Sequence, residues 1–178
     1  KSVLAGGGCD FYNKDWYDNV MCIYEFETYQ KKPARAFYQV LTTTAMGGYF
    51  EQFMGTEGTI RMSENPALTK IYKENRPEIE EKWNALVADG TLIKKAMVEA
   101  KVADARESKP PQEYGFELNL TKPIHMPHLE NFFNAIRGKE KLNCDGEHAF
   151  EAEAAVYKVN EAVEAKKMLY FKDEDFVA

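Results

Sequence analysis

A Gly-x-x-Gly turn between two short apolar runs is the feature that most constrains the fold of this chain. Gly55 and Gly58 separate residues 49–54 from residues 59–63, and both runs are rich in apolar or β-branched side chains. Such runs favour β-strands, and glycine adopts positive φ at low cost in tight turns. The pattern therefore predicts an antiparallel β-hairpin whose two glycines have positive φ.

Two earlier segments also have strand character. Residues 18–28 alternate between two sets of side chains, and residues 34–44 contain aromatic and β-branched residues followed by three threonines. A polar turn that contains proline separates them, so we expect an antiparallel pair. Residues 68–73 predict a further strand at the edge of the sheet. Strand follows strand along the chain, as in a β-meander.

Three glycines near the start of the chain superficially resemble a phosphate-binding loop. Gly6, Gly7 and Gly8 follow a short apolar run, but residues 9–12 do not begin a helix and no Lys-Ser/Thr pair follows. We interpret the segment as a flexible turn. The sequence also lacks a Gly-x-Gly-x-x-Gly fingerprint after a strand, so no segment is typical of a dinucleotide-binding site.

Helical spacing dominates three later segments. Residues 76–88 have a proline in the first turn and end before an Asp-Gly pair, which stops helices. Residues 128–137 place aromatic and aliphatic side chains on one face and end before a glycine. Residues 145–167 begin with an aspartate suited to an N-cap and end with two lysines. Each segment predicts a helix.

The remaining segments of the second half are shorter or less regular. Residues 116–120 and 168–171 alternate as short strands do. Residues 91–105 have helical spacing but are dominated by lysine and glutamate, which leaves their structure open. We expect residues 75–113 to form a helical excursion from the sheet.

Length and charge exclude several classes of protein. The chain has 178 residues, of which 44% are hydrophobic and 13% aromatic, and this suits one domain with an aromatic core. A net charge of -6 without a run of basic residues predicts neither nucleic acid nor an anionic membrane as partner. No stretch approaches the roughly 18 apolar residues of a membrane-spanning helix. We expect a cytoplasmic protein, and export through an upstream signal is the alternative.

The cysteines do not form a recognisable framework. Cys9, Cys22 and Cys144 are odd in number, widely spaced and free of any Cys-x-x-Cys pattern. This arrangement predicts neither a set of disulfides nor a zinc site. We expect three buried or half-buried free thiols.

Two histidines three residues apart raise the possibility of a metal site. His125 and His128 precede or begin an expected helix, where this spacing can place both imidazoles on one side. A site needs more ligands, and Glu130 and His148 are the candidates, but the chain has no His-Glu-x-x-His pattern. Two interpretations therefore stay open: the histidines bind a metal in a metal-dependent enzyme, or one of them lines a pocket or caps the helix.

Residues 42–49 form the most promising binding segment. Thr42 and Thr44 offer hydroxyl groups at a strand end, where they suit the hydroxyls of a sugar or polyol. Gly47 and Gly48 let a ligand approach the backbone closely. The alternative is that the threonines only reflect β-propensity.

Four segments in a fixed order form a pattern that resembles a known family. They are Asp18-Asn19-Val20 leading into Tyr24-Glu25-Phe26, the hairpin around Gly55 and Gly58, residues 128–137, and the last helix with residues 168–171. In order and spacing they resemble the carboxy-terminal domain of Gfo/Idh/MocA-type NAD(P)-dependent oxidoreductases. The resemblance implies an α+β fold: an open, mostly antiparallel β-sheet with helices packed on one face. It also implies one substrate-binding and oligomerisation domain over residues 1–178, without the amino-terminal Rossmann domain that binds NAD or NADP.

The resemblance also implies where the substrate binds. In relatives the strand before the hairpin lines the substrate pocket, which places Thr44, Met46 and Tyr49 near the sugar. The candidate substrate-binding residues are therefore Thr42, Thr44, Met46, Tyr49, His125 and His128. The family's catalytic lysine in a Glu-Lys-Pro segment and its Asp-x-x-x-His pair do not occur in this sequence, so the resemblance assigns no catalytic residue here.

Two further points concern substrate and partners. Gly47 and Gly48 replace the bulky polar residues of other members, which leaves the substrate class open. The sheet face of such domains commonly packs against a second subunit, so Arg35, Tyr38 and Gln39 are expected at a homo-oligomer interface.

The leading hypothesis is that the parent protein is an NAD(P)-dependent oxidoreductase acting on a sugar, inositol or related polyol. This chain then supplies substrate contacts and oligomer contacts, binds no cofactor and is inactive alone. The alternatives are a free-standing α+β binding or assembly module without enzymatic activity, and a metal-dependent enzyme that uses His125 and His128.

Overall fold

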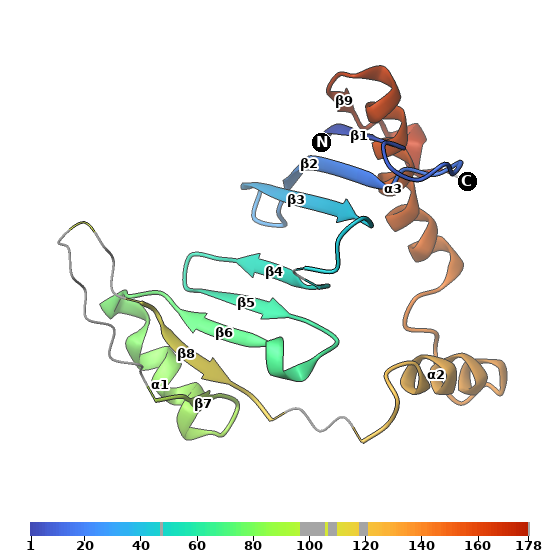
Figure 1. Ribbon diagram of the computed structural model, residues 1–178. Coiled ribbons are helices and arrows are strands. Elements are labelled where there is room, and N and C mark those ends of the chain that lie inside the picture. Colours follow the sequence, from blue (N-terminus) through green and yellow to red (C-terminus); the bar gives the residue numbers. More distant parts are fainter. Residues whose placement is uncertain (47, 97–105, 107–109, 118–120, 178) are drawn as a thin grey trace. The chain divides into compact units, whose positions relative to one another are not determined.

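The structure, a computed structural model, describes residues 1–46, 48–96, 106, 110–117 and 121–177 and consists of two compact units (Figure 1). One unit combines Lys1–Met46 with Asn131–Ala178, and the other is Gly47–Glu130. Every strand pairing among the described residues is antiparallel. The predicted α+β class is therefore confirmed, with the strands hydrogen-bonded in two sets. The single domain stays a prediction.

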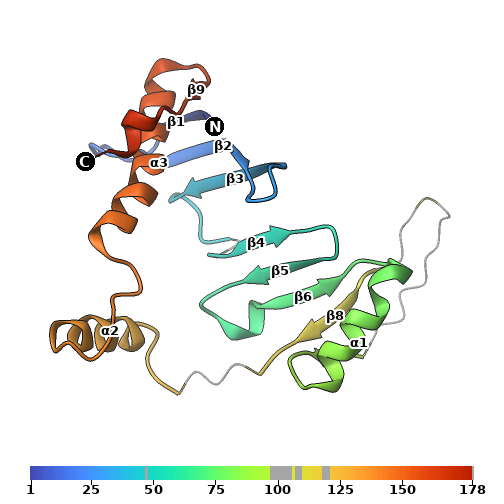
Figure 2. The same ribbon diagram turned by 180° about the vertical axis from the view of Figure 1, so that it is seen from behind.

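The first unit contains a four-stranded sheet in the order β3-β2-β1-β9. Its strands are β1 (Ser2–Gly8), β2 (Asn19–Glu27), β3 (Pro33–Leu41) and β9 (Leu169–Tyr170). Helix α3 (Gly146–Ala165) lies against this sheet, as Figures 1 and 2 show. The predicted pair of residues 18–28 with 34–44 and the final strand are confirmed.

The core of this unit lies between α3 and one face of the sheet. Val3 and Cys22 on the strands pack with Val159, Ala162 and Val163 on the helix, all of them buried. Small and β-branched helix residues let the helix approach the sheet closely, and burial of these side chains stabilises the unit.

Helix α3 begins and ends as its sequence predicts. The carboxylate of Asp145 accepts a hydrogen bond from the backbone N–H of His148 at 3.0 Å, which satisfies one of the free donors of the first turn. Lys166 ends the helix in the left-handed conformation with φ 51°. The Tyr24 hydroxyl donates to the carbonyl of Ala155 at 3.0 Å and thereby ties strand to helix, and burial raises the pKa of this tyrosine.

The prediction of a flexible turn at the three early glycines is wrong. Gly6, Gly7 and Gly8 are the last residues of β1 and pair with Met21, Val20 and Asn19. A Cβ on Gly7 would overlap the Asn19 carbonyl, and one on Gly8 would lie 2.9 Å from an Asp10 carboxylate oxygen. The glycines therefore permit close approach of neighbouring chain segments within a strand.

The two faces of this sheet differ. Because paired residues share a face, Leu4, Ile23 and Phe37 lie together on the side opposite the buried core and are 42%, 45% and 63% exposed. Arg35 and Gln39 lie on that same open face. Tyr38 pairs with Cys22 and therefore lies on the α3 side, so the three predicted interface residues do not share one face.

The second unit contains a five-stranded sheet in the order β4-β5-β6-β8-β7. Its strands are β4 (Glu51–Met54), β5 (Gly58–Met62), β6 (Lys70–Lys73), β7 (Ile93–Lys94) and β8 (Gln112–Gly115). A short 3₁₀ helix, η1 (Pro66–Leu68), precedes β6. The predicted hairpin is confirmed as the β4–β5 pair.

One strand of this unit lies elsewhere in the sheet than predicted. The strand predicted at the sheet edge is β6, which lies inside the sheet between β5 and β8. The strand predicted at residues 116–120 falls largely on residues 118–120, which lie outside the described part; the described strand nearby is β8, at Gln112–Gly115, which pairs with β6. Only the partner strands, which are distant in sequence, decide these positions.

Helix α1 (Glu80–Ala88) covers one face of this sheet after the 3₁₀ helix η2 (Pro77–Ile79). Trp83 packs on Tyr114 with ring centroids 5.0 Å apart, and both side chains are buried. Gly90 stops the helix with φ +83°. The helix predicted at residues 76–88 is confirmed, but β7 and the first two residues of β8, which also fall within the predicted excursion, pair in the sheet. Most of residues 91–105, from 97 on, lie outside the described part.

The glycines of the hairpin do not have the predicted positive φ. Among the described residues, positive-φ glycines are found at Gly48, Gly90 and Gly138, so the expectation for Gly55 and Gly58 is wrong. Gly58 is instead required by packing, because a Cβ there would lie 2.6 Å from the Tyr72 carbonyl oxygen and 2.8 Å from the indole of Trp83.

Helix α2 (Met126–Ile136) confirms the helix predicted at residues 128–137. Leu129, Phe132, Phe133 and Ile136 are 40%, 46%, 48% and 67% exposed. Gly138 follows with φ +68°. Amphipathic spacing therefore predicted the helix correctly although its apolar side is not buried within this chain.

The cysteines are free, as expected, but only Cys22 is buried, while Cys9 and Cys144 are exposed. The expectation of burial is therefore wrong for these two.

Among the helices that the structure describes, none has the length and hydropathy of a membrane span.

Candidate functional site

The strand ends of the four-stranded sheet bring two loops together. β1 ends at Gly8, β2 begins at Asn19 and β3 ends at Leu41, and these three residues are aligned across the sheet. Residues 9–18 therefore leave the same end of the sheet as residues 42–46. Loops at strand ends are common positions for binding sites, because the sheet fixes their bases.

Asp18 organises the first of these loops. It is 1% exposed, and its carboxylate accepts hydrogen bonds from the backbone N–H groups of Tyr12 at 2.8 Å, Phe11 at 2.8 Å and Asp10 at 3.2 Å. The side-chain amide of Asn19 donates to the same carboxylate at 2.9 Å. One buried acceptor thus satisfies three backbone donors of the loop, which holds it in one conformation.

These contacts also fix the charge of Asp18. The N–H groups of Tyr12 and Phe11 stabilise the ionised carboxylate and lower its pKa far below the ordinary value, against the opposing effect of burial. A carboxylate with such a low pKa stays ionised near neutral pH and cannot act as a general acid or base there. Asp18 therefore has a structural role in this site.

Asp18 also connects the loop to the predicted substrate segment. Its carbonyl oxygen accepts hydrogen bonds from the backbone N–H of Thr42 at 3.0 Å and from the Thr42 hydroxyl at 3.1 Å. Thr44 accepts from the backbone N–H of Met46 at 3.3 Å through its hydroxyl. Thr42 is thus committed to loop structure, while the exposed Thr44 and Met46 follow it on the same segment.

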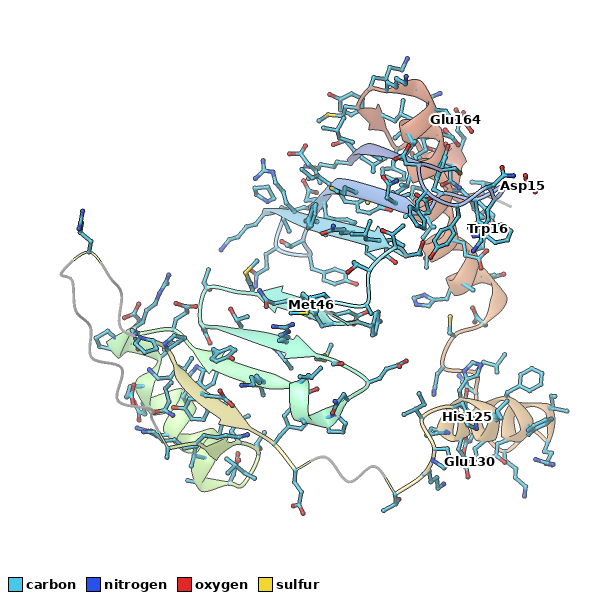
Figure 3. The ribbon with its side chains drawn as sticks, in the orientation of Figure 1. Asp15, Trp16, Met46, His125, Glu130 and Glu164 are labelled. Carbon is cyan, nitrogen blue, oxygen red and sulfur yellow. The ribbon has the colours of Figure 1, made fainter. Side chains whose placement is uncertain are left out.

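Aromatic side chains dominate the surface of the first loop. Trp16 is 64% exposed and Phe11 73% exposed, and Figure 3 shows Asp15 and Trp16 on this loop. The ammonium group of Lys14 lies 4.4 Å from the ring centroid of Tyr12 and 5.4 Å from that of Trp16. The Cys9 thiol approaches the Trp16 carbonyl oxygen at 3.1 Å. Phe11 and Trp16 thus present aromatic ring surface to solvent on a loop that hydrogen bonds to Asp18 hold in place.

The other predicted site residues belong to the second unit. Tyr49 donates its hydroxyl to the Glu51 carboxylate at 3.0 Å. His125 lies exposed just before α2, and His128 lies exposed in the first turn of α2. Figure 3 labels His125 and Glu130. Of the predicted site residues, the structure therefore joins Thr42 directly to Asp18, and Thr44 and Met46 follow Thr42 in the chain.

The predicted metal ligands do not form a site in the described residues. Glu130 is engaged by the ammonium group of Lys122 at 2.7 Å. Groups of three or more His, Cys, Asp or Glu side chains arranged to hold a metal are absent from the part of the chain that the structure describes. His148, the remaining candidate ligand, belongs to the first unit.

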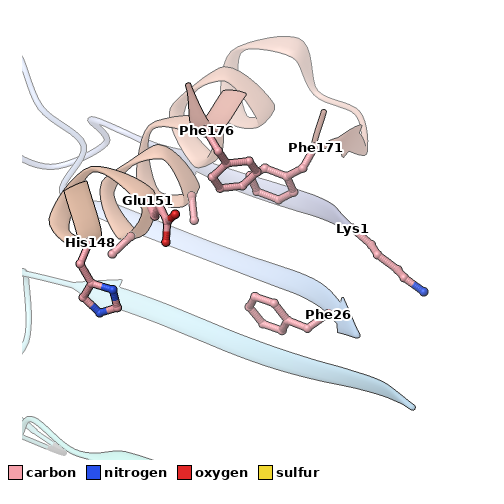
Figure 4. Close-up of a pocket in the computed structure, with 8 residues that line it drawn as sticks. Lys1, Phe26, His148, Glu151, Phe171 and Phe176 are labelled. Atoms are coloured by element: carbon pink, nitrogen blue, oxygen red, sulfur yellow. The ribbon is translucent and has the colours of Figure 1, made fainter. Parts of the chain in front are cut away.

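A separate pocket of about 460 Å³ lies in the first unit (Figure 4). Its walls are mainly apolar, with the rings of Phe171 and Phe176 5.7 Å apart, and polar groups at its border. The lining residues are Lys1, Phe26, His148, Glu151, Ala152, Ala155, Phe171 and Phe176. The size suits a small ligand.

Sequence reasoning missed Asp18, Trp16 and this pocket. The signal for Asp18 was present, because an aspartate between a polar loop and a strand commonly accepts hydrogen bonds from nearby backbone N–H groups. The pocket joins side chains from β2, from α3 and from the end of the chain. No local pattern contains that information.

Comparison with known proteins finds solved structures with a similar fold. No model of a protein family matches the chain, and no curated protein matches it. Among solved structures, an NAD-binding protein from Listeria innocua aligns over 96% of this chain with a TM-score of 0.58 and 17% identity. An NAD binding oxidoreductase from Klebsiella pneumoniae aligns over 97% with a TM-score of 0.57 and 13% identity.

A third similar structure is the WlbA dehydrogenase from Bordetella pertussis in complex with NADH and UDP-GlcNAcA, with 96% of this chain aligned, a TM-score of 0.55 and 12% identity. The chain spans 45%, 45% and 40% of these three proteins respectively. It therefore shares the fold of a part of each of these proteins and spans less than half of their length.

Proposed function

We propose that this chain is the carboxy-terminal substrate-binding and oligomerisation domain of a longer NAD(P)-dependent oxidoreductase of the Gfo/Idh/MocA type. The observation that carries the proposal is the fold shared over 96% of this chain with 45% of an NAD-binding protein. The proposed substrate is a sugar, inositol or related polyol, and the NAD(P)-binding domain precedes Lys1 in the parent protein.

Two described segments, the early glycines and the start of α3, do not have the features of a dinucleotide site. Gly6, Gly7 and Gly8 lie inside strand β1 and lead into the loop of residues 9–18, whereas a pyrophosphate site needs a glycine turn that opens a helix. Helix α3 begins after Asp145, whose carboxylate accepts from one N–H of the first turn and would repel phosphate. Hydride transfer is therefore assigned to the parent protein and not to this chain.

The proposed role of this chain is to bind and orient the substrate. Thr44 and Met46, which follow β3, are the substrate contacts proposed for the first unit, and Tyr49, His125 and His128 are those proposed for the second unit. Hydroxyl and imidazole groups can both donate and accept hydrogen bonds, which suits the many hydroxyls of a polyol. A binding domain contributes to hydride transfer mainly because it holds the substrate in one orientation.

The proposed oligomer forms through the open face of the four-stranded sheet. Leu4, Ile23 and Phe37 form an exposed apolar group there, with Arg35 and Gln39 beside it. Burial of these side chains against a second copy would remove them from water. Phe37→Glu should shift the chain toward monomers in sedimentation velocity, while Tyr29→Glu, at the turn beyond β2, should not.

A free-standing binding module is the second candidate. The pocket beside Phe26 and Phe171 favours it, because that pocket is built entirely within the first unit. This candidate predicts a ligand that binds this chain independently of any cofactor domain.

Titration of the 178-residue chain with NADH, followed by calorimetry, tests the division of roles. The proposal predicts no saturable NADH binding, together with saturable binding of a polyol detected by NMR. Stoichiometric NADH binding would show that this chain holds its own cofactor site and would contradict the proposal.

A further inference from the structure

We infer that the loop of residues 9–18 is a stacking platform for the ring of a neutral sugar or cyclitol, with Trp16 as the contact surface and Asp15 as a hydroxyl acceptor. The inference rests on the proposed function and specifies its substrate. It concerns residues that neither the sequence pattern nor the fold comparison singled out.

The first step is that the platform is built before the ligand arrives. The buried Asp18 carboxylate holds the N–H groups of Phe11 and Tyr12 at 2.8 Å each, and the Cys9 thiol lies 3.1 Å from the Trp16 carbonyl oxygen. A loop that is already ordered loses little conformational entropy when it binds a ligand.

The second step concerns the available surface of Trp16. Its side chain is 64% exposed, and the Lys14 ammonium group lies 5.4 Å from its ring centroid and 4.4 Å from that of Tyr12. Lys14 thus restrains the indole from one side and leaves ring surface for a ligand. The C–H groups on one face of a pyranose or cyclitol carry partial positive charge, which the negative face of an indole attracts.

The third step is charge. Residues 9–18 contain the carboxylates of Asp10, Asp15 and Asp18 but a single ammonium group, that of Lys14. Asp10 accepts from Asn19 at 2.6 Å and Asp18 from the loop backbone, whereas Asp15 is exposed and has no ion pair within the described residues. A carboxylate accepts hydrogen bonds from sugar hydroxyls but repels an anionic group. The platform therefore selects neutral rings over uronates and sugar phosphates.

The experiment uses the two tryptophans of the chain, Trp16 and Trp83, as internal probe and control. Methyl glucoside, myo-inositol and glucuronate are titrated into the ¹⁵N-labelled 178-residue chain, and the indole N–H signals are followed. The neutral ligands should shift the signal of the exposed Trp16 saturably. The signal of Trp83, which is 7% exposed, should not move.

Variants separate stacking from charge. Trp16→Ala should weaken binding of the glucoside about twofold to twelvefold, since an aromatic contact contributes about 0.5–1.5 kcal/mol, and Trp16→Phe should retain part of the affinity. Tyr29→Ala is the matched control, because Tyr29 is also fully exposed but lies at the turn joining β2 and β3, at the other end of these strands. Asp15→Asn should reduce the preference for glucoside over glucuronate.

Two results would overturn the inference. In one, a neutral ligand shifts signals of residues 42–46 but not that of Trp16, and Trp16→Ala binds normally; the proposed function then stands and the platform does not. In the other, glucuronate binds more tightly than the glucoside. Failure of the proposed function has a different signature, which is saturable binding of NADH.

Discussion

Gly58→Ala should destabilise the second unit, although the substitution adds one methyl group to a strand. The new Cβ would lie 2.6 Å from the Tyr72 carbonyl oxygen, a backbone atom of the neighbouring strand β6, and 2.8 Å from the indole of Trp83. The indole is packed on Tyr114 and is 7% exposed, so it has little room to move. Overpacking of this kind costs about 1–3 kcal/mol, and we expect the upper half of that range because one obstacle is backbone.

Gly55→Ala is the matched control within the same hairpin. Its Cβ would lie 3.4 Å from the Gly58 carbonyl oxygen, an ordinary contact, and Gly55 does not have positive φ. Alanine then restricts the unfolded chain and stabilises by about 0.4–1 kcal/mol. The two variants should therefore differ by about 3 kcal/mol in free energy of unfolding.

The assay is urea unfolding followed by Trp83 fluorescence in a Trp16→Phe background, in which Trp83 is the one remaining tryptophan. With a slope of about 2 kcal/mol per molar urea, the midpoints of the two variants should differ by about 1.5 M. Midpoints that agree within about 0.3 M would refute the argument that close packing requires Gly58.

Further predictions concern Asp18, Tyr114, Tyr24 and Ala162. Asp18→Asn should destabilise the first loop. Because the pKa of Asp18 in the folded protein lies below the ordinary 3.8, the difference in free energy of unfolding between wild type and variant should be complete above pH 3.8 and should shrink as the pH falls from there toward the folded pKa. A difference that persists unchanged in acid would contradict the account. Tyr114→Phe should be neutral or stabilising by up to about 1 kcal/mol in urea unfolding, since its buried hydroxyl has no hydrogen-bond partner among the described residues, and a clear loss of stability would reveal one. Tyr24→Phe should cost about 0.5–1.5 kcal/mol in thermal unfolding through loss of the bond to Ala155, and an unchanged Tm would show that the bond contributes nothing. Ala162→Leu should cost about 1–3 kcal/mol, because Ala162 is fully buried between α3 and the sheet, and tolerance by calorimetry would mean that the core is loosely packed there.

Local chemistry explains which elements could be predicted from the sequence. The N-cap of Asp145 and the stop at Gly90 act within one helical turn, so the sequence nearby contains the whole signal. The β4–β5 hairpin is likewise local. The position of β8 was not predictable in this way, because its register is set by β6, about forty residues earlier in the chain.

The glycine errors have one physical origin. Glycine serves either backbone freedom or close packing, and a sequence does not distinguish the two. Gly7 and Gly58 both serve packing, against the Asn19 carbonyl and against Trp83 respectively. Such contacts exist only after distant segments have been brought together.

The candidate site was predictable in part. Thr42 and Thr44 were located by their residue type at a strand end, and the structure shows Thr42 hydrogen-bonded to Asp18 and Thr44 to Met46, while their role in binding stays a prediction. The organising role of Asp18 depends on three backbone N–H groups six to eight residues earlier, and the aromatic surface depends on the loop that these bonds shape. The hydrogen bonds of a folded loop are a property of its conformation and not of its composition.

The most direct test of the central claim is the intact mass of the protein in its native cells, detected with an antibody against the 178-residue chain. A product larger than 20.4 kDa by a domain of about 100–200 residues, with an upstream sequence that contains a dinucleotide fingerprint, is the predicted result. A product of 20.4 kDa would contradict the proposal and favour a free-standing binding module.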